Sequence, residues 1–565
     1  MTKRFASRRW AGLFLFVVLL QAGICQADVR LPGIFGSHMV LQQDIKIPIW
    51  GWADAGEAVT ITLGDKTAKT TADANGKWRV DLDPVTTAAT PLTLTVAGKN
   101  SLKFDDVLVG DVWVCSGQSN MQLPLKVVHN AATEIPKAND SQLRLFSVGG
   151  KLAIDPETDV KGQWVVCSPA SASSFSAVGY FFGRELRRAL NRPIGLIGTY
   201  WGGTPAHAWT SLSGLQKDPP FSHAIDVYRQ IAANYPKAKE EYPAVLAAYQ
   251  DQFKKWKEAN DAVVKQWQDA VNQAKASGQP APPQPPPNPP MARGPNLPEG
   301  PAETPTVLYN GMIAPLMPYA IKGVIWYQGE ANTGNGLEYR TLFPRMISDW
   351  REKWHQGDFP FLYVQLPNYR PPQNQPSEGG WAYLREAQLM TLALPNTGMA
   401  ITIDVGDAND LHPKDKLDVG LRLAQDAKHV AYGQDVVYSG PLYDSMKIEG
   451  NKIRVAFKDT GSGLQMSTQP WTPPGAPVPA PTELTGFAIA GADKNWVWAQ
   501  AKIDGNTVLI SSDQVASPVA VRYGWASDPP CNLYNKEGLP ASPFRTDDWT
   551  DPVVFSDFPW SVFSK

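Results

Sequence analysis

The sequence is poor in cysteine, and this limits what can hold it together. Its 565 residues include only four cysteines, and Cys115, Cys167 and Cys531 are the three beyond the N-terminal segment. An odd number excludes a fully paired disulfide framework. One bridge and buried free thiols both stay open, while Cys115, within an apolar run, is expected to be a small buried strand residue.

The chain also lacks an excess of charge of either sign. Lys and Arg total 52 against 54 Asp and Glu, which gives a net charge of -2, and charged residues are only 19% of the chain. Without a basic surface field, a nucleic-acid partner is not expected. Aromatic residues are abundant instead, with 20 Trp, and these serve either as sugar-stacking platforms or as core.

Long apolar runs are absent except near the N-terminus. The run 10–20 is apolar and too short to cross a bilayer. With the basic residues before it and Ala27 as a cleavage position, it predicts a signal peptide over 1–27. A twin-arginine signal at Arg8-Arg9 and a lipoprotein at Cys25 fit less well. The mature protein is expected to be secreted or periplasmic, with no membrane association.

The remaining chain divides by pattern into three parts. Short β-type runs separated by turns predict a β-sandwich over 28–105, which either binds carbohydrate or braces the rest of the chain, bracing being favoured. Alternating strand and helix patterns over 106–434 predict an α/β domain with a parallel sheet covered by helices. β-type runs return over 435–565.

An insertion at about 215–306 interrupts the α/β domain. Apolar residues recur at four-three spacing between residues 242 and 271, which predicts a helix with one apolar seam. Packing on the body is the default for this helix, with a dimer seam or a lid as alternatives. The Pro- and Gly-rich stretch 278–305 is expected to be extended.

One serine follows a predicted buried strand at 107–114. Ser119 lies in the stretch Cys-Ser-Gly-Gln-Ser-Asn-Met, and no glycine stands two residues later, which argues against the G-x-S-x-G elbow. Serine needs a base within hydrogen-bond reach. His412 and Asp410, in Asn-Asp-Leu-His-Pro, offer a base and an orienting acid. This set predicts an acyl-transfer enzyme.

Two further loops offer donors for an oxyanion. Gly202 and Gly203, in Trp-Gly-Gly-Thr, present backbone amides without side-chain bulk. Gln328, in Trp-Tyr-Gln-Gly-Glu-Ala-Asn, places an amide side chain at the end of a predicted strand. Taken singly, each loop also reads as an ordinary tight turn or strand end.

These motifs, taken as an ordered set, resemble the sialate O-acetylesterase type of the SGNH hydrolase superfamily. The end of the chain, 531–547, resembles that family as well. The resemblance implies a flavodoxin-like α/β/α SGNH core, no metal or other cofactor, and an acetylated glycan as partner. It further implies that Ser119 attacks the acetyl carbonyl, that His412 takes its proton, and that the Ser119 amide, a Gly202 or Gly203 amide and Gln328 hold the oxyanion.

Some residues follow the family pattern and others depart from it. Many SGNH enzymes place the acid three residues before the histidine, where this chain has Asn409. Asp410 is therefore the first choice, with Asp407 or a main-chain carbonyl as rivals. The resemblance also implies substrate contacts for Gln118, Trp201, His207, Tyr327, Glu330, Asn332 and Arg385.

Two of these positions carry a more specific expectation. Relatives often have glutamate where this chain has His207, so some change in substrate contact is expected there. Arg385 and Gln388 match the family and are expected to organise the site rather than to do chemistry.

The sequence thus predicts a carbohydrate O-acetylesterase. A non-catalytic carbohydrate-binding protein and an esterase for non-sugar acyl chains are the alternatives. The sequence does not distinguish acetylated sialic acid from acetylated plant glycans such as xyloglucan or xylan, and it leaves the oligomeric state open.

Overall fold

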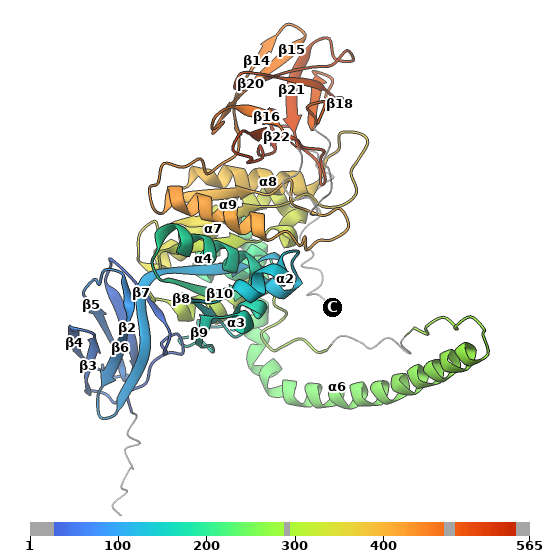
Figure 1. The fold of residues 1–565 in the computed structure, drawn as a ribbon. Helices are drawn as coiled ribbons and strands as arrows, with labels where there is room; N and C mark the ends of the chain where they lie inside the picture. Colours follow the sequence, from blue (N-terminus) through green and yellow to red (C-terminus); the bar gives the residue numbers. More distant parts are fainter. Residues whose placement is uncertain (1–27, 287–293, 468–480, 550–565) are drawn as a thin grey trace, which may run out of the picture.

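A computed structural model describes residues 28–286, 294–467 and 481–549 of the chain (Figure 1). The predicted signal peptide, 1–27, lies outside these residues. None of the helices in the described ranges is long and apolar enough to cross a membrane.

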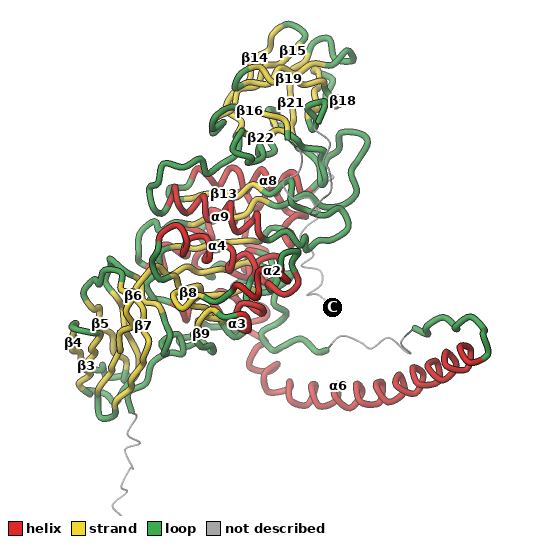
Figure 2. Tube along the Cα trace, viewed as in Figure 1, coloured by secondary structure: helices red, strands yellow, loops and turns green. Residues whose placement is uncertain are grey.

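Six parallel strands form the centre of the molecule, with antiparallel β9 at one edge (Figure 2). Most of their residues are buried, as expected for a parallel sheet covered on both faces. The spatial order is β13-β12-β11-β7-β10-β8-β9. The strands are β7 (Ser101–Gly117), β8 (Asp140–Ser147), β9 (Trp164–Cys167), β10 (Ile194–Tyr200), β11 (Gly323–Tyr327), β12 (Phe361–Gln365) and β13 (Thr397–Ile401). The predicted α/β class is confirmed.

The order of these strands places the site. A flavodoxin-like sheet has its first strand between the second and third. Here β10, the third parallel strand along the chain, lies between β8 and β7, so the order differs from that expectation. The chain still crosses to the other half of the sheet beside β7, and ligands bind outside the carboxyl ends of strands at such a switch point.

Two pairs of longer helices pack beside this sheet (Figure 1). One pair contacts strands in both halves of the sheet, and the other includes a helix that contacts β12. The first pair is α4 (Ala177–Leu190) and α9 (Leu417–Val430), and the second is α7 (Gly336–Trp354) and α8 (Gly380–Met390). Shorter helices are α1 (Ser119–Gln122), α2 (Ala131–Glu134), α3 (Pro169–Ser174) and α5 (Leu212–Leu215).

The N-terminal β-strands are continuous with the central sheet through β7. This strand is 17 residues long; its first part pairs with β6, and its last part lies between β10 and β11. The domain boundary predicted near residue 105 falls inside it, and one apolar core spans both parts. The other strands are β1 (Val40–Gln42), β2 (Ile47–Trp52), β3 (Ala58–Leu63), β4 (Lys66–Thr71), β5 (Lys77–Leu82) and β6 (Ala88–Ala97).

The insertion contains the helix α6 (Ser222–Ala276), which leaves the body of the molecule (Figure 1). Its buried residues lie only between Ala224 and Tyr228. The default expectation that the apolar seam packs on the body is therefore wrong. The first part of the Pro-rich stretch, 278–286, contacts the helix instead, since Trp267 donates a hydrogen bond to the carbonyl of Pro282 at 3.0 Å.

The C-terminal part is β-rich and has its own apolar core. It comprises small antiparallel sheets. The strands are β14 (Leu442–Glu449), β15 (Lys452–Lys458), β16 (Leu464–Met466), β17 (Phe487–Gly491), β18 (Trp496–Trp498), β19 (Gln500–Asp504), β20 (Thr507–Ser511), β21 (Pro518–Tyr523), β22 (Leu533–Asn535) and β23 (Phe544–Arg545).

The three cysteines of the described chain are free thiols. Cys115 lies in β7 and is fully buried, as its apolar neighbours predicted. Cys167 is buried as well, so of the two possibilities left open by the sequence the structure has free thiols.

Candidate active site

Ser119 begins the short helix α1 directly after β7 ends. The turn depends on Gly117, whose φ of +136° is a conformation that side chains disfavour. A Cβ there would lie 2.1 Å from the carbonyl oxygen of Tyr327 in β11. The amide of Gln118 donates to that same oxygen at 3.0 Å. β7 and β11 thus fix the turn and place Ser119 at the carboxyl edge of the sheet.

His412 reaches Ser119 from the loop between β13 and α9. Its Nε2 lies 2.9 Å from Oγ of Ser119, although the two residues are 293 positions apart. The imidazole is 37% exposed, so the pair is accessible from solvent. Burial lowers the pKa of His412 below its ordinary value; Asp410 acts to raise it, and Lys416 and Lys414 act to lower it further. A neutral imidazole at this position can accept the serine proton.

Asp410 contacts His412 without a direct hydrogen bond to its ring. Its Oδ1 accepts the main-chain N–H of His412 at 2.8 Å and lies 4.0 Å from Nδ1. Its Oδ2 lies 3.2 Å from Nζ of Lys414. Burial acts to raise the pKa of Asp410, but the His412 amide and Lys414 outweigh it, so the pKa lies below the usual value. The rival Asp407 caps its own turn by accepting the N–H of Asn409 at 2.8 Å.

The Trp-Gly-Gly loop after β10 lies against the serine. A Cβ on Gly202 would stand 3.3 Å from Cβ of Ser119, so glycine allows this close approach. The Gly202 amide donates to Oε1 of Gln122 at 3.0 Å, and Gly203 has a φ of +76° and faces open space. Because Gln122 is exposed, a substrate oxygen that displaced it would find a backbone donor beside Oγ.

The oxyanion role expected for Gln328 does not agree with its contacts. Gln328 is fully buried, and its amide nitrogen donates to the carbonyl of Thr204 at 3.2 Å and to Oδ1 of Asn332 at 2.7 Å. Its Oε1 accepts the hydroxyl of Tyr339 at 2.8 Å. Both N–H bonds are therefore engaged, so Gln328 fixes the loop after β10 to the loop after β11.

Most of the residues expected to touch substrate are buried in this same framework. Asn332 accepts the amide of Ala206 at 2.9 Å, and Gln118 accepts that of Ala331 at 3.3 Å. His207 is fully buried and bonded to Glu338. These side chains support the loops of the site, because their polar atoms bond to neighbouring segments of the protein. Of the remaining members, Tyr327 and Arg385 are buried, and Glu330 and Trp201 are half-buried.

Arg385 joins the core to the C-terminal part, as the expected organising role implied. Its guanidinium donates to the carbonyls of Leu366, Pro367, Ala526 and Ser527 at 2.6 to 2.8 Å. Gln388 is also buried; it accepts the amide of Leu366 and donates to the carbonyls of Gln328 and Val364.

A buried polar network underlies Ser119 and His412. Asn120 donates to Oε1 of Glu330 and, at 3.0 Å, to the carbonyl of Leu411. Nζ of Lys416 donates to Oδ1 of Asn120 at 2.7 Å, and Lys416 is fully buried. A single amide thus connects the serine turn, the loop after β11 and the histidine loop.

Burial dominates the charges of this network. It lowers the pKa of Lys416 to about 7, against the attraction of Glu330. It also raises the pKa of Glu330, against the hydrogen bond from Asn120. No role was expected for Asn120 or Lys416 from the sequence. The available signal was their position, one residue after Ser119 and four after His412.

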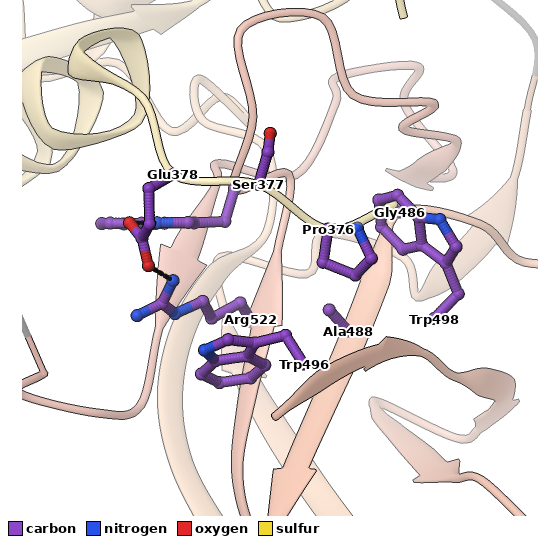
Figure 3. A pocket seen from close by; sticks show the side chains of 9 residues that line it. Pro376, Ser377, Glu378, Gly486, Ala488, Trp496, Trp498 and Arg522 are labelled. Atoms are coloured by element: carbon purple, nitrogen blue, oxygen red, sulfur yellow. Dashed lines mark hydrogen bonds and ion pairs between the residues drawn. The ribbon is translucent and has the colours of Figure 1, made fainter. Parts of the chain in front are cut away.

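A small cavity lies where the loop after β12 meets the C-terminal sheets (Figure 3). Trp496, Trp498 and Trp525 line it beside the ion pair of Glu378 and Arg522. Its volume is about 60 Å³, which is room for about two water molecules. It is too small for a sugar ring, so we interpret these tryptophans as packing between the α/β core and the C-terminal part.

Comparison with known proteins gives this site its context. The chain is 30% identical to rat sialate O-acetylesterase, with 95% of this chain and 98% of that protein covered. The chain belongs to the sialate O-acetylesterase family. The human enzyme of the same name is 29% identical, with 94% of this chain and 95% of that protein covered. The family described as carbohydrate esterase, sialic acid-specific acetylesterase, matches residues 300–429.

A solved structure agrees with the sequence relatives. A carbohydrate acetylesterase from Xanthomonas citri is 36% identical and superposes with a TM-score of 0.72, covering 92% of this chain and all of that one. The resemblance seen in the motifs is therefore confirmed, and this member of the family is an ester hydrolase acting on carbohydrate acetyl esters. Within the described residues no group of three or more acidic, histidine or cysteine side chains is arranged to hold a metal ion.

Proposed function

We propose that this protein hydrolyses acetyl esters on sugar hydroxyls through an acetyl-serine intermediate of the SGNH type. The observation that carries the proposal is the 2.9 Å contact between Nε2 of His412 and Oγ of Ser119 at the carboxyl edge of the sheet. Nucleophile and base within hydrogen-bond reach are the arrangement that activates a serine.

The reaction follows from this geometry in two steps. Oγ of Ser119 attacks the acetyl carbonyl while His412 takes its proton, and the imidazolium then gives that proton to the departing sugar oxygen. Water next attacks the acetyl-serine, with His412 again as base, and acetate leaves as Oγ recovers its proton. The oxyanion is held by the Ser119 amide and by the amides of Gly202 and Gly203, with the Gly202 amide becoming available once Gln122 is displaced.

Asp410 acts on the histidine mainly through the backbone in this proposal. Its carboxylate binds the His412 N–H and lies 4.0 Å from Nδ1. A small rotation of the ring or the carboxylate would bring the pair into contact as charge develops on the imidazole. Asp410 therefore orients the loop and offsets the charge of the imidazolium.

The substrate is an acetylated glycan by analogy with the relatives, either an O-acetylated sialoside or a plant cell-wall glycan. Export to the periplasm or beyond is the location we propose, because such substrates lie outside the cytoplasm and residues 1–27 have the pattern of a signal peptide.

Acetate release from a panel of acetylated glycans tests the proposal. The panel holds O-acetylated sialosides, xyloglucan oligosaccharides and xylan, with Ser119→Ala as the blank. We expect release from at least one class and none above background from the variant. Release that persists in Ser119→Ala would overturn the serine mechanism, and no release from any class by folded protein would favour a binding role or another ester.

A further inference from the structure

A second concave surface lies toward the amino ends of the parallel strands, whereas Ser119 lies at their carboxyl ends. It is a groove of about 460 Å³ between the two-stranded sheet of β2 and β5 and the central core. Its core wall includes Met317 and Pro318, which precede β11, so it lies at the amino ends of the parallel strands. Ser119 follows the carboxyl end of β7. The groove is therefore separate from the active site.

The pairing of β2 and β5 places two tryptophans and two basic side chains on one face. Trp50 is paired with Arg79 and Trp52 with Lys77, so their side chains share a face. The intervening pair, Gly51 and Trp78, also lines the groove. Both tryptophans are half-buried, and Lys77 and Arg79 are exposed. This face forms one wall of the groove.

The orientation of the two indoles is fixed by neighbouring side chains. The guanidinium of Arg30 lies 4.1 Å from the ring centroid of Trp52, within the range of a cation–π contact. Trp50 packs edge-on against Phe35 at 4.7 Å between centroids. Preformed aromatic surfaces lose little conformational entropy when a ligand binds.

The polar lining of the groove carries no net charge. Asp73 and Glu157 oppose Lys77 and Arg79 around the aromatic floor. The volume falls in the ~300–1,000 Å³ range of small-molecule sites. Indole rings accept the C–H face of a pyranose, and surrounding carboxylate and ammonium groups bond its hydroxyls. A balanced lining favours a neutral sugar chain over a polyanionic one.

We propose that this groove binds a stretch of a neutral, pyranose-based polysaccharide and anchors the enzyme to its polymeric substrate. The 60 Å³ cavity at the C-terminal part differs from this groove, because its tryptophans leave no room for a sugar. A polymer held at the groove raises the local concentration of its acetyl groups near Ser119 without any new contact in the active site.

Binding to deacetylated polysaccharide tests the proposal independently of the esterase activity. Native gels containing xyloglucan as the neutral probe, or polygalacturonate as the anionic one, retard proteins that bind the polymer. We expect xyloglucan alone to retard the parent protein. Trp52→Ala should weaken the apparent affinity about tenfold, Trp52→Phe should keep most of it, and Trp267→Ala on α6 should match the parent.

Two further readouts separate the groove from the fold and from the active site. Lys77→Ala changes an exposed side chain, so it should weaken retardation without a change in melting temperature. Trp52→Ala should leave hydrolysis of a small chromogenic acetate unchanged. Unaltered retardation of Trp52→Ala, no retardation of the parent by xyloglucan, or a change in oligomeric state as the only effect of Trp52→Ala would each overturn the proposal.

Discussion

The two sides of the serine turn differ sharply in their surroundings. On one side, the open side, Ser119 and His412 meet where the imidazole is accessible from solvent. On the other, the sealed side, Asn120 and Lys416 are fully buried, Glu330 is half-buried, and Asn120 bonds to both of the others. The consecutive residues Ser119 and Asn120 thus have different roles. The open side can change partners during a reaction, while the sealed side holds the geometry constant.

Removal of the base should affect the open side most. His412→Ala removes the proton acceptor of Ser119, so we expect kcat/KM for acetate release to fall on the order of 10⁴- to 10⁶-fold. The half-exposed ring adds little to the core, so the melting temperature should stay near that of the parent. A variant that is active to within tenfold would contradict the role of His412.

Removal of the central amide should affect the sealed side instead. Asn120→Ala leaves Nζ of Lys416 and Oε1 of Glu330 without their shared partner. Unpaired buried polar groups cost about 1–3 kcal/mol each, so urea unfolding should show a loss of at least that size. Asn120→Asp, which keeps the acceptor for Lys416, is the matched comparison. An unchanged free energy of unfolding in Asn120→Ala would show that the network does not stabilise the fold.

A smaller effect is expected from Asp410, which spans both sides through the backbone of His412. Asp410→Asn keeps an oxygen for the His412 N–H but removes the charge. With 4.0 Å between the carboxylate and Nδ1, we expect a fall in kcat of about tenfold, far less than for a directly bonded acid. Asp407→Asn is the control. A greater loss in Asp407→Asn than in Asp410→Asn would reverse the assignment.

The smallest effect is a shift in the pH dependence of kcat/KM. It tests whether the charge of Lys416, on the sealed side, changes the pKa of His412, on the open side. Burial and the charge of Lys416 lower the pKa of His412, so the acidic limb of kcat/KM, where activity rises as His412 loses its proton, should lie below pH 6.5. Lys416→Met removes a positive charge, which favours the imidazolium, so the limb should move up by about half a pH unit. A limb that does not move in Lys416→Met would show that Lys416 does not affect the pKa of His412.

The lowered pKa of Lys416 also predicts that the free energy of unfolding depends on pH. Its pKa in the folded protein is about 7, below the value of about 10.4 in an unfolded chain. Between these values the unfolded chain binds more protons, so this group makes the free energy of unfolding rise with pH across that window. The rise should be absent in Lys416→Met, and denaturant titrations at pH 7 and pH 9 measure it.

Much of the open side could be predicted from the sequence. Ser119 and Gly202 each follow a strand, and parallel strands bring their carboxyl ends to one edge, so their meeting follows from the pattern. The orientation of side chains could not be predicted in the same way. Gln328 points inward because Thr204, Asn332 and Tyr339 offer it partners, and those contacts exist only in the folded packing.

Two features of the fold were also beyond the sequence pattern. The apolar seam of α6 predicted packing on the body, yet the first part of the Pro-rich stretch contacts it, as the bond from Trp267 to Pro282 shows. Likewise, the change of pattern near residue 105 gave no sign that a single strand, β7, continues through it. Both cases depend on which surface a segment meets, and local periodicity does not determine that.

The central claim is that Ser119 is the nucleophile, and covalent labelling tests it most directly. A fluorophosphonate probe, located by peptide mass mapping, should modify Ser119 in the parent and nothing in Ser119→Ala. Ser116→Ala is the matched control, because this neighbouring serine is fully buried in β7 and should not affect labelling. Labelling of another residue, or acetate release that survives in Ser119→Ala, would contradict the account.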